Sequence, residues 1–375
     1  QEVKTEAKDR LARAAELLAG DGLPAPALDG KALRPLAGFA IVPPELRSRL
    51  DHRFWWGALA VEMVHEASLL HDDILDDAPQ RRGKPTLAAS AGVGPALVLG
   101  DHLLTSAYRV AASTDSPVFL DLFIRGVERT VAGEIAQEKR QGDVLSPEEY
   151  RETITSKSGE LFRAVFALAP ALLGVGDPHR VGEVGARLGR LYQMVDDYLD
   201  YCPSAQRGKP PLQDYHQQKW TWPLELVEAR GFTADEESIH RELFSRPDSG
   251  GPSPMERGLD VMDGEIRSLL ADLEGEGMEP ALLGEMLQGW RDQMAGAAER
   301  ERSLLASPLA GSLRVNPEIE GDTHPRYGVP ARAREAVQAA ASDLTSPEDW
   351  KRYFGKHARS FRFASRLFPA HELEK

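Results

Sequence analysis

Apolar residues recur at intervals of three and four along most of the first 305 residues. This spacing is typical of α-helices, in which residues at those separations share a face. Within residues 54–71, 97–113, 151–175 and 182–201 the apolar side chains are too numerous for a single face, which predicts helices that are buried on nearly all sides. Strict alternation and two-residue hairpin signals are scarce. The pattern therefore predicts an all-α fold.

Two stretches interrupt the helical pattern. Residues 246–254, with the sequence RPDSGGPSP, are predicted to form an exposed loop because proline and glycine do not continue a helix. Residues 307–330 carry several prolines without a helical period, which is typical of an interdomain linker. The expected organisation is a domain over residues 1–306, a proline-rich linker over 307–330 and a helical tail over 331–375 that is too short to bury a core alone.

Composition narrows the class of protein. The chain has 45 Lys and Arg against 59 Asp and Glu, a net charge of −14, which argues against wholesale binding to nucleic acid or to an anionic membrane surface. The single cysteine, Cys202, excludes an internal disulfide framework and favours a reducing, cytoplasmic location. No apolar run is long enough for a transmembrane helix, and the first residues lack the pattern of a signal peptide.

Two acidic clusters of the form Asp-Asp-x-x-Asp lie at the ends of strongly apolar predicted helices, in residues 72–76 and 196–200. Like charges one helical turn apart destabilise a helix by about 0.2–0.5 kcal/mol per pair, so the clusters call for a compensating cation. Oxygen ligands select a hard ion, and Mg²⁺ would complete its shell with substrate phosphate oxygens. The alternative, a solvated acidic face, is disfavoured by the repetition of the motif. The predicted metal ligands are Asp72, Asp73, Asp76, Asp196, Asp197 and Asp200.

A basic turn, RRGKPT in residues 81–86, follows the first cluster directly. Cations beside metal-binding carboxylates are useful when both hold the same diphosphate group. Together with DGKALRP in residues 29–35 and YQMVDDYLD in residues 192–200, these motifs resemble those of the trans-isoprenyl diphosphate synthases, the family of farnesyl and geranylgeranyl diphosphate synthases. The resemblance covers roughly residues 25–300. It implies a class I isoprenoid synthase helical bundle with a central active-site cavity.

The resemblance implies two substrates, isopentenyl diphosphate and an allylic diphosphate primer, and a homodimer or higher homo-oligomer. It also implies that Mg²⁺ bridged by Asp72, Asp76 and Asp196 withdraws charge from the allylic leaving group. Ser158 and Gln193 resemble residues that present oxygen dipoles to the resulting cation. The resemblance implies that isopentenyl diphosphate is bound by Lys31, Arg34, His65 and Arg82, and the allylic diphosphate by Arg81, Lys157 and Lys209. It also implies that Gln193 and Lys219 belong to the substrate site. The catalytic candidates are Lys157, Ser158, Gln193 and Lys209.

Side-chain size near the first cluster bears on product length. Ala67 and Ser68 lie about one turn before Asp72, where family members that stop at fifteen carbons place bulky aromatic residues. Both residues are small here, which predicts a tunnel open to twenty carbons or more and therefore a geranylgeranyl diphosphate product. The alternative is that the two small residues merely permit close helix packing.

The tail carries a weaker resemblance. Residues 357–369, HARSFRFASRLFP, are similar to the first helix of squalene and phytoene synthases. The resemblance implies that the natural polypeptide continues into a fused prenyl-condensing domain. The alternative is a basic amphipathic helix that packs on the main domain.

Two other functions compete with this interpretation. A class I terpene cyclase usually carries an Asn-x-x-x-Ser-x-x-x-Glu second metal motif and does not need Lys31, Arg34 and His65. A non-catalytic regulatory subunit tends to lose one aspartate cluster, and both are intact. Ala32 in place of a basic residue and Leu212 in place of a glycine are the departures that give the regulatory hypothesis weight.

Overall fold

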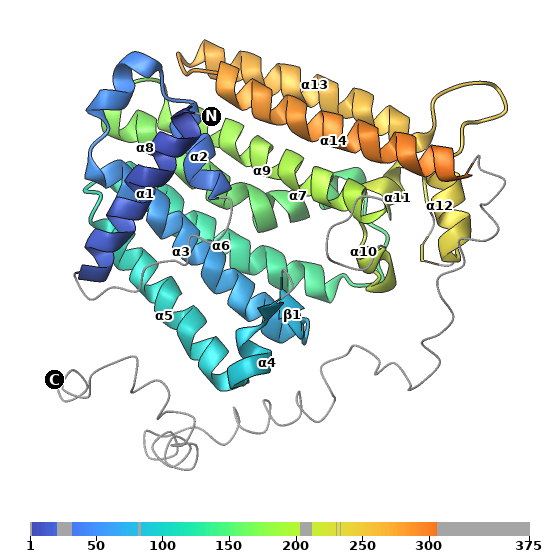
Figure 1. The fold of residues 1–375 in the computed structure, drawn as a ribbon, viewed down its shortest axis with the longest axis horizontal. Coiled ribbons are helices and arrows are strands. Elements are labelled where there is room, and N and C mark those ends of the chain that lie inside the picture. Colours follow the sequence, from blue (N-terminus) through green and yellow to red (C-terminus); the bar gives the residue numbers. More distant parts are fainter. Residues whose placement is uncertain are drawn as a thin grey trace. The chain divides into compact units, whose positions relative to one another are not determined.

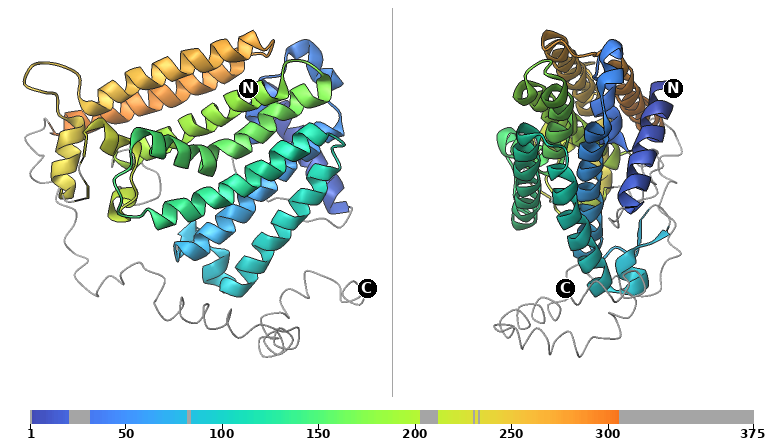
Figure 2. Two further views of the ribbon diagram at one scale, coloured as in Figure 1. Left: turned by 180° about the vertical axis from the view of Figure 1, so that it is seen from behind. Right: turned by 90° about the vertical axis from the view of Figure 1, so that its left-hand side faces the viewer.

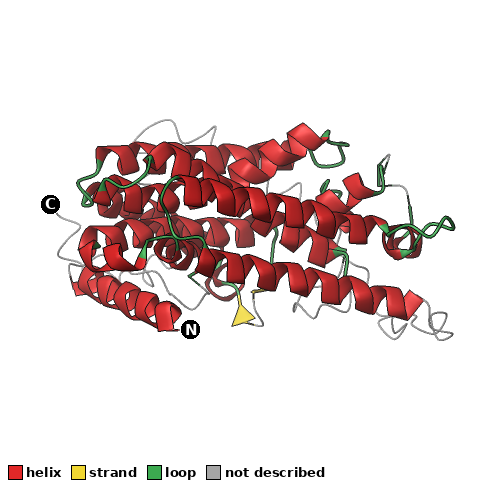
Figure 3. Cartoon of the chain, turned by 90° about the horizontal axis from the view of Figure 1, so that it is seen from above, coloured by secondary structure: helices red, strands yellow, loops and turns green. Residues whose placement is uncertain are grey.

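The computed structural model describes residues 2–20, 32–81, 84–202, 212–229, 231–232 and 234–305. This part of the chain is almost entirely helical, so the predicted all-α fold is confirmed (Figure 3). The predicted linker and tail lie outside the described residues, as do Lys31, Arg82 and Lys209.

The elements follow one another as helices joined by short connections, with one small antiparallel hairpin in which Arg81 pairs with Lys84. The longer helices are α1 (Glu2–Gly20), α3 (His52–Leu75), α5 (Val93–Ala112), α6 (Pro117–Lys139), α8 (Glu160–Leu173), α9 (Pro178–Asp200), α13 (Pro254–Gly275) and α14 (Ala281–Leu305). The shorter elements are α2 (Leu33–Ala40), the 3₁₀-helix η1 (Pro44–Arg49), β1 (Gln80–Arg81), β2 (Lys84–Pro85), α4 (Leu87–Ala91), α7 (Pro147–Ile154), the π-helical turn η2 (Thr155–Gly159), α10 (Gln213–His216), α11 (Trp222–Leu226) and α12 (Glu236–Phe244).

Three of the four predicted buried segments match single helices, α3, α5 and α9. The fourth, over residues 151–175, does not, because a π-helical turn separates α7 from α8. For α5 the predicted burial on nearly all sides is wrong, because Leu97 and Val98 are 47% and 45% exposed. The predicted loop over residues 246–254 lies between α12 and α13 and is confirmed up to Ser253, where the capping residue of α13 stands.

The described residues divide into two compact units. The smaller unit consists of residues Val64–Thr105 and contains the end of α3, the hairpin, α4 and the start of α5. The larger unit contains the residues before Val64 and those from Ser106 onward. The first aspartate cluster therefore belongs to the smaller unit and the second to the larger one.

The core of the larger unit is the packing of α9 against α8 (Figures 1 and 2). Glycines on α9 make its approach to α8 and to η2 close. A Cβ atom at Gly185 would lie 2.5 Å from the carbonyl oxygen of Phe162 in α8, and one at Gly189 would lie 2.6 Å from that of Ser158 in η2. Helices α2 and α6 pack against α8, while α13 and α14 pack against each other and against α9. Helix α9 begins at Pro178, where the Asp177 side chain accepts a backbone hydrogen bond as its N-cap.

No helix in the described ranges combines the length and the apolar character that crossing a bilayer requires.

Candidate active site

The first aspartate cluster occupies the last turn of α3 and the residue after it. The amide of Asp76 donates to the carbonyl oxygen of Asp72 at 2.8 Å, so the helical turn continues through the motif. Asp77 then adopts a positive φ of 46°, which ends the helix. Asp73 is only 5% exposed, whereas Asp72 is half-buried and Asp76 is exposed.

The hairpin after α3 places an arginine side chain beside this cluster. Arg81 lies on β1, and its Nε donates to Oδ1 of Asp73 at 2.8 Å. The hydroxyl of Thr86 donates to the carbonyl oxygen of Ala78 at 2.7 Å and fixes the base of the hairpin. The basic turn and the acidic helix end therefore meet, with the buried carboxylate of Asp73 bound to an arginine.

The candidate chain-length residues also lie in the smaller unit. Ala67 is 1% exposed. Ser68 is half-buried, and its hydroxyl donates to the carbonyl oxygen of His65 at 2.8 Å within α3. The Ser68 hydroxyl is thus satisfied by its own helix, and His65 is half-buried two turns before Asp72.

The second aspartate cluster ends α9, and its middle residue is 2% exposed. Oδ2 of Asp197 accepts a hydrogen bond from the Tyr150 hydroxyl at 2.6 Å, and Oδ1 accepts one from Nε2 of Gln193 at 2.8 Å. Burial raises the pKa of Asp197 to about 7, and the negative charge of Asp214 acts in the same direction, while these two hydrogen bonds oppose it. Burial also raises the pKa of Tyr150 well above its ordinary value, so Tyr150 remains a donor.

Lys157 and Ser158 lie in the π-helical turn η2, a type of irregularity that is frequent at functional sites. Close packing holds the turn in place: a Cβ atom at Gly133 of α6 would lie 2.8 Å from Cβ of Ser156 and 3.1 Å from the amide nitrogen of Lys157. The ammonium group of Lys157 donates to Oε2 of Glu134 at 3.0 Å and to Oε1 of Gln137 at 2.9 Å.

Arg34 lies on α2 and is 8% exposed. Its guanidinium stands 5.1 Å from the ring centroid of Phe162 and 3.9 Å from a carboxylate oxygen of Glu62. Burial lowers the pKa of Arg34, against the charge of Glu62. Within the described ranges, Nε of Arg34 is buried and has no hydrogen-bond acceptor. The residue before α2, Ala32, adopts a left-handed conformation with φ 46°.

The segment that follows the second cluster folds back onto it. The amide of Leu212 donates to the carbonyl oxygen of Asp200 at 2.9 Å, and the amide of Asp214 donates to Oδ2 of Asp200 at 3.1 Å. The amide of Lys219 in turn donates to the carbonyl oxygen of Asp214 at 2.8 Å. Leu212 has φ 55°, the left-handed conformation that the family's usual glycine adopts freely, so the departure is accommodated at a cost of about 1–2 kcal/mol.

The described residues contain no preassembled group of three or more His, Cys, Asp or Glu side chains that would hold a metal ion. The donor chemistry nevertheless fits a hard divalent ion, because the outer residues of both clusters offer carboxylate oxygens. Asp76 is exposed and Asp72, Asp196 and Asp200 are half-buried, unlike the middle residues.

Most of these residues were candidates from the sequence, but Tyr150 was not. It lies in the first turns of α7 and joins the second cluster across 47 residues of sequence. Its only signal in the sequence was its position ahead of Lys157 in the same predicted helix.

Comparison with known proteins identifies relatives. The chain is 33% identical over 171 residues to the octaprenyl diphosphate synthase of Escherichia coli K12. The matched region covers 44% of this chain and 53% of that protein. It is 29% identical over 203 residues to the geranylgeranyl diphosphate synthase of Sulfolobus acidocaldarius, covering 51% and 61%. The chain spans about half the length of the first of these curated relatives.

Solved structures agree with the fold. A polyprenyl synthase from Caulobacter crescentus CB15, complexed with calcium and isoprenyl diphosphate, is 26% identical with a TM-score of 0.50, over 79% of this chain and 97% of that one. Heptaprenyl diphosphate synthase from Staphylococcus aureus has a TM-score of 0.60 over 78% and 96% at 18% identity, which shows the shared fold alone. The family model described as polyprenyl synthetase matches residues 25–249. The chain therefore belongs to the polyprenyl synthetase family.

Proposed function

We propose that this protein is a metal-dependent trans-prenyltransferase that joins isopentenyl diphosphate to an allylic diphosphate and releases a trans-polyprenyl diphosphate. The observation that carries the proposal is the arrangement at the end of α9. There Ser158, which lies in the π-helical turn that also carries Lys157, donates a hydrogen bond to Gln193, and Gln193 donates one to Asp197 of the second aspartate cluster. Membership of the polyprenyl synthetase family supports the same chemistry.

Each aspartate cluster offers an outer pair of carboxylates, Asp72 with Asp76 and Asp196 with Asp200, that would hold Mg²⁺. When bound, the ion supplies Lewis-acid withdrawal of charge from a diphosphate leaving group. The middle residues, Asp73 and Asp197, were also expected as ligands from the sequence. Their carboxylates are already engaged by Arg81 and by Tyr150 with Gln193, which supports an orienting role for both.

The cations have distinct proposed tasks. Arg81, held by Asp73, binds the allylic diphosphate, and Lys157, held by Glu134 and Gln137, contributes positive charge to the same group. Arg34 binds isopentenyl diphosphate, which its buried Nε–H supports, because a phosphate oxygen is a suitable acceptor for it. Lys31, His65 and Arg82 are proposed for the isopentenyl site, and Lys209 and Lys219 for the diphosphate groups.

The developing allylic cation requires nearby electron density and the exclusion of water. The oxygen atoms of Ser158 and Gln193 are proposed to supply the electron density, and neither residue need act as a base. The departing diphosphate is proposed to accept the proton that the condensation releases.

The proposed product has at least twenty carbons, with geranylgeranyl diphosphate as the first candidate. The small side chains of Ala67 and Ser68 support a tunnel that is open beyond fifteen carbons. The names of the curated relatives include geranylgeranyl, octaprenyl and nonaprenyl diphosphate synthases, so longer products fall within the range to be tested.

A cytoplasmic homo-oligomer completes the proposal. Apolar side chains along α6 are 39–51% exposed, and exposed apolar surface of this kind is typical of protein interfaces. The exposed residues are Val118, Ile124, Val131 and Ile135. Sedimentation equilibrium of the purified protein tests the oligomer.

A fusion to a second prenyl-condensing domain is also proposed, and the coding sequence downstream of Lys375 tests it.

The test of the activity is a condensation assay with purified protein, Mg²⁺, labelled isopentenyl diphosphate and each allylic primer, with products sized by chromatography. We expect Mg²⁺-dependent elongation that is abolished by a chelator. Asp72→Ala and Asp196→Ala are each expected to remove most turnover, because each deletes a proposed ligand. A wild-type protein with no turnover on any primer would favour the regulatory subunit, and cyclic hydrocarbon products would favour the terpene cyclase.

A further inference from the structure

Hydrogen bonds join side chains of α7, η2 and α9 into one chain. The Ser158 hydroxyl donates to Oε1 of Gln193 at 2.7 Å, and Nε2 of Gln193 donates to Oδ1 of Asp197 at 2.8 Å. The Tyr150 hydroxyl donates to Oδ2 of the same carboxylate at 2.6 Å. Tyr150 and Asp197 are each 2% exposed and Ser158 is 8% exposed, so little water competes for these bonds.

The Asp197 carboxylate determines which atom donates and which accepts in each of these hydrogen bonds. Both oxygens of Asp197 accept hydrogen bonds in this arrangement, so the amide group of Gln193 turns its NH₂ toward Asp197. Oε1 of Gln193 then faces Ser158 and takes the single hydroxyl proton of that residue. With its proton committed, the Ser158 oxygen has only lone pairs to offer to its remaining surroundings.

We propose that Asp197 and Tyr150 are positioning residues, which orient Gln193 and Ser158 so that oxygen lone pairs, and no hydroxyl proton, face the electron-poor carbon of the reacting allylic group. This inference rests on the proposed function. It assigns the middle aspartate of the second cluster to this hydrogen-bond chain rather than to the metal-ligand set.

The orientation has a direct electrostatic consequence. An oxygen lone pair stabilises a nearby carbocation, whereas a hydroxyl proton or an amide NH₂ aimed at the same carbon destabilises it. Asparagine at position 197 would offer both a donor and an acceptor, so Gln193 would no longer have a single preferred orientation. Phenylalanine at position 150 would leave the carboxylate with one donor fewer.

The test compares Asp197→Asn and Tyr150→Phe with wild type for kcat, both KM values and the Mg²⁺ concentration that gives half-maximal rate. We expect Asp197→Asn to lower kcat about tenfold or more, as expected for losing a hydrogen bond to a charged group, with half-saturation by Mg²⁺ unchanged within about twofold. Tyr150→Phe should lower kcat severalfold with the same Mg²⁺ dependence. Tyr215→Phe is the matched control, because it removes a hydroxyl that donates at 2.7 Å to the carbonyl oxygen of Ala234, and its kcat should be unchanged.

Substitutions at Ser158 test whether the effect passes through this residue. Ser158→Ala should lower kcat, and Ser158→Thr, which retains the hydroxyl, should restore it. The double variant Tyr150→Phe/Ser158→Ala should lose less than the product of the two single losses, because both changes act on one chain of bonds.

A specific result overturns the assignment. If Asp197→Asn raises the Mg²⁺ requirement several-fold and regains the wild-type kcat at saturating Mg²⁺, Asp197 is a metal ligand. If Asp197→Asn does not fold, as judged by circular dichroism, Tyr150→Phe decides, and a wild-type kcat in that folded variant overturns the proposal. A wild-type protein without condensation activity would overturn the proposed function and this assignment together, whereas the other results overturn the assignment alone.

Discussion

Nε of Arg81 lies 2.8 Å from Oδ1 of Asp73, and this contact attaches the hairpin after α3 to the first aspartate cluster. The carboxylate is nearly buried, with its side chain 7% exposed, while the Arg81 side chain is 32% exposed. The bond therefore holds Nε of the guanidinium against a nearly buried carboxylate, while the Arg81 side chain stays partly accessible to an anion.

Asp73→Asn should raise KM for the allylic primer several-fold and change KM for isopentenyl diphosphate much less. The reason is that an asparagine oxygen is a weaker acceptor than a carboxylate, so Arg81 is less firmly oriented. Steady-state kinetics with each substrate varied in turn measures both constants. Asp77→Asn is the control, because Asp77 is exposed and has a left-handed conformation that asparagine tolerates. An Asp73→Asn variant altered only in its Mg²⁺ requirement would instead identify Asp73 as a metal ligand.

Gly133→Ala should disturb the π-helical turn that carries Lys157. The new Cβ would meet Cβ of Ser156 at 2.8 Å and the Lys157 amide at 3.1 Å, so the backbone of the turn must move. We expect a lower kcat and a loss of about 1–3 kcal/mol in the free energy of unfolding, the usual cost of overpacking. Urea denaturation and the condensation assay measure the two effects.

The control for that substitution is Gly264→Ala. Gly264 lies within α13, and a Cβ atom there would contact nothing within 4 Å. Replacing this glycine should stabilise the protein by about 0.5–1 kcal/mol through helix propensity, without a change in kcat. Equal stability losses at both positions would contradict the packing explanation for Gly133.

The hydrophobic pattern predicted the helices because burial in this fold follows the helical period closely, as in α9. It did not predict the π-helical turn at Lys157, because residues 151–175 carry apolar side chains on nearly every side, so the phase shift caused by one extra residue leaves no visible break in the pattern. That turn depends on tertiary contacts with Gly133 and Gly189, which no local pattern records.

The residues of the candidate site were proposed from the sequence, which did not distinguish roles within each aspartate cluster. In the sequence the aspartates of each cluster are equivalent, and only the structure separates Asp73 and Asp197 from the outer ones by burial and partners. The bond between Tyr150 and Asp197 joins positions 47 residues apart, beyond the reach of any periodicity.

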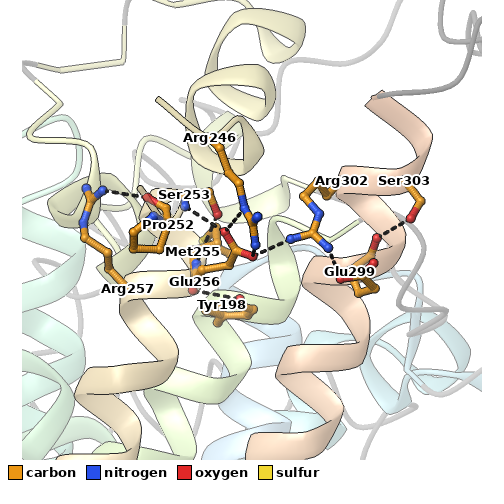
Figure 4. A network of polar contacts seen from close by, with 10 residues as sticks. All are labelled: Tyr198, Arg246, Pro252, Ser253, Met255, Glu256, Arg257, Glu299, Arg302 and Ser303. Carbon is orange, nitrogen blue, oxygen red and sulfur yellow. Dashed lines mark hydrogen bonds and ion pairs between the residues drawn. The ribbon is translucent and has the colours of Figure 1, made fainter. Parts of the chain in front are cut away.

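Glu256 is the centre of a network of ion pairs and hydrogen bonds at the start of α13, and this network depends on pH (Figure 4). Glu256 caps the helix with Ser253 and receives hydrogen bonds from Arg246 at 2.6 and 3.0 Å and from Arg302 of α14. The hydrogen bond from Arg246 is the largest cause that lowers the pKa of Glu256 to about 2. The Tyr198 hydroxyl donates to the carbonyl oxygen of Met255 and links the start of α13 to α9.

Glu256→Gln should reduce the free energy of unfolding at pH 7 by about 1 kcal/mol, less than the pKa shift alone implies, because solvent screens the pair. A carboxyl whose pKa is lower in the folded state than in the unfolded state stabilises the protein above the unfolded value of about 4.5. That contribution is lost as the pH falls toward about 2. Urea titrations from pH 7 to pH 3 should therefore show the difference between variant and wild type shrinking below pH 5. Glu299→Gln, which removes an exposed partner of Arg302, should change stability by less than about 0.5 kcal/mol at every pH.

Ala67→Phe tests what sets product length. Ala67 is 1% exposed on α3, so an aromatic ring there must displace whatever fills the space beside it. If that space receives the growing prenyl tail, the variant folds normally and its main product is shorter by one five-carbon unit or more. If the space is a helix contact, the product distribution stays the same while overpacking costs about 1–3 kcal/mol of stability. Chromatography of the products and thermal melting separate the two outcomes, and Leu75→Phe, at a position 53% exposed on the same helix, should change neither. Wild-type product length in a stable Ala67→Phe protein would mean that side chains other than Ala67 terminate elongation.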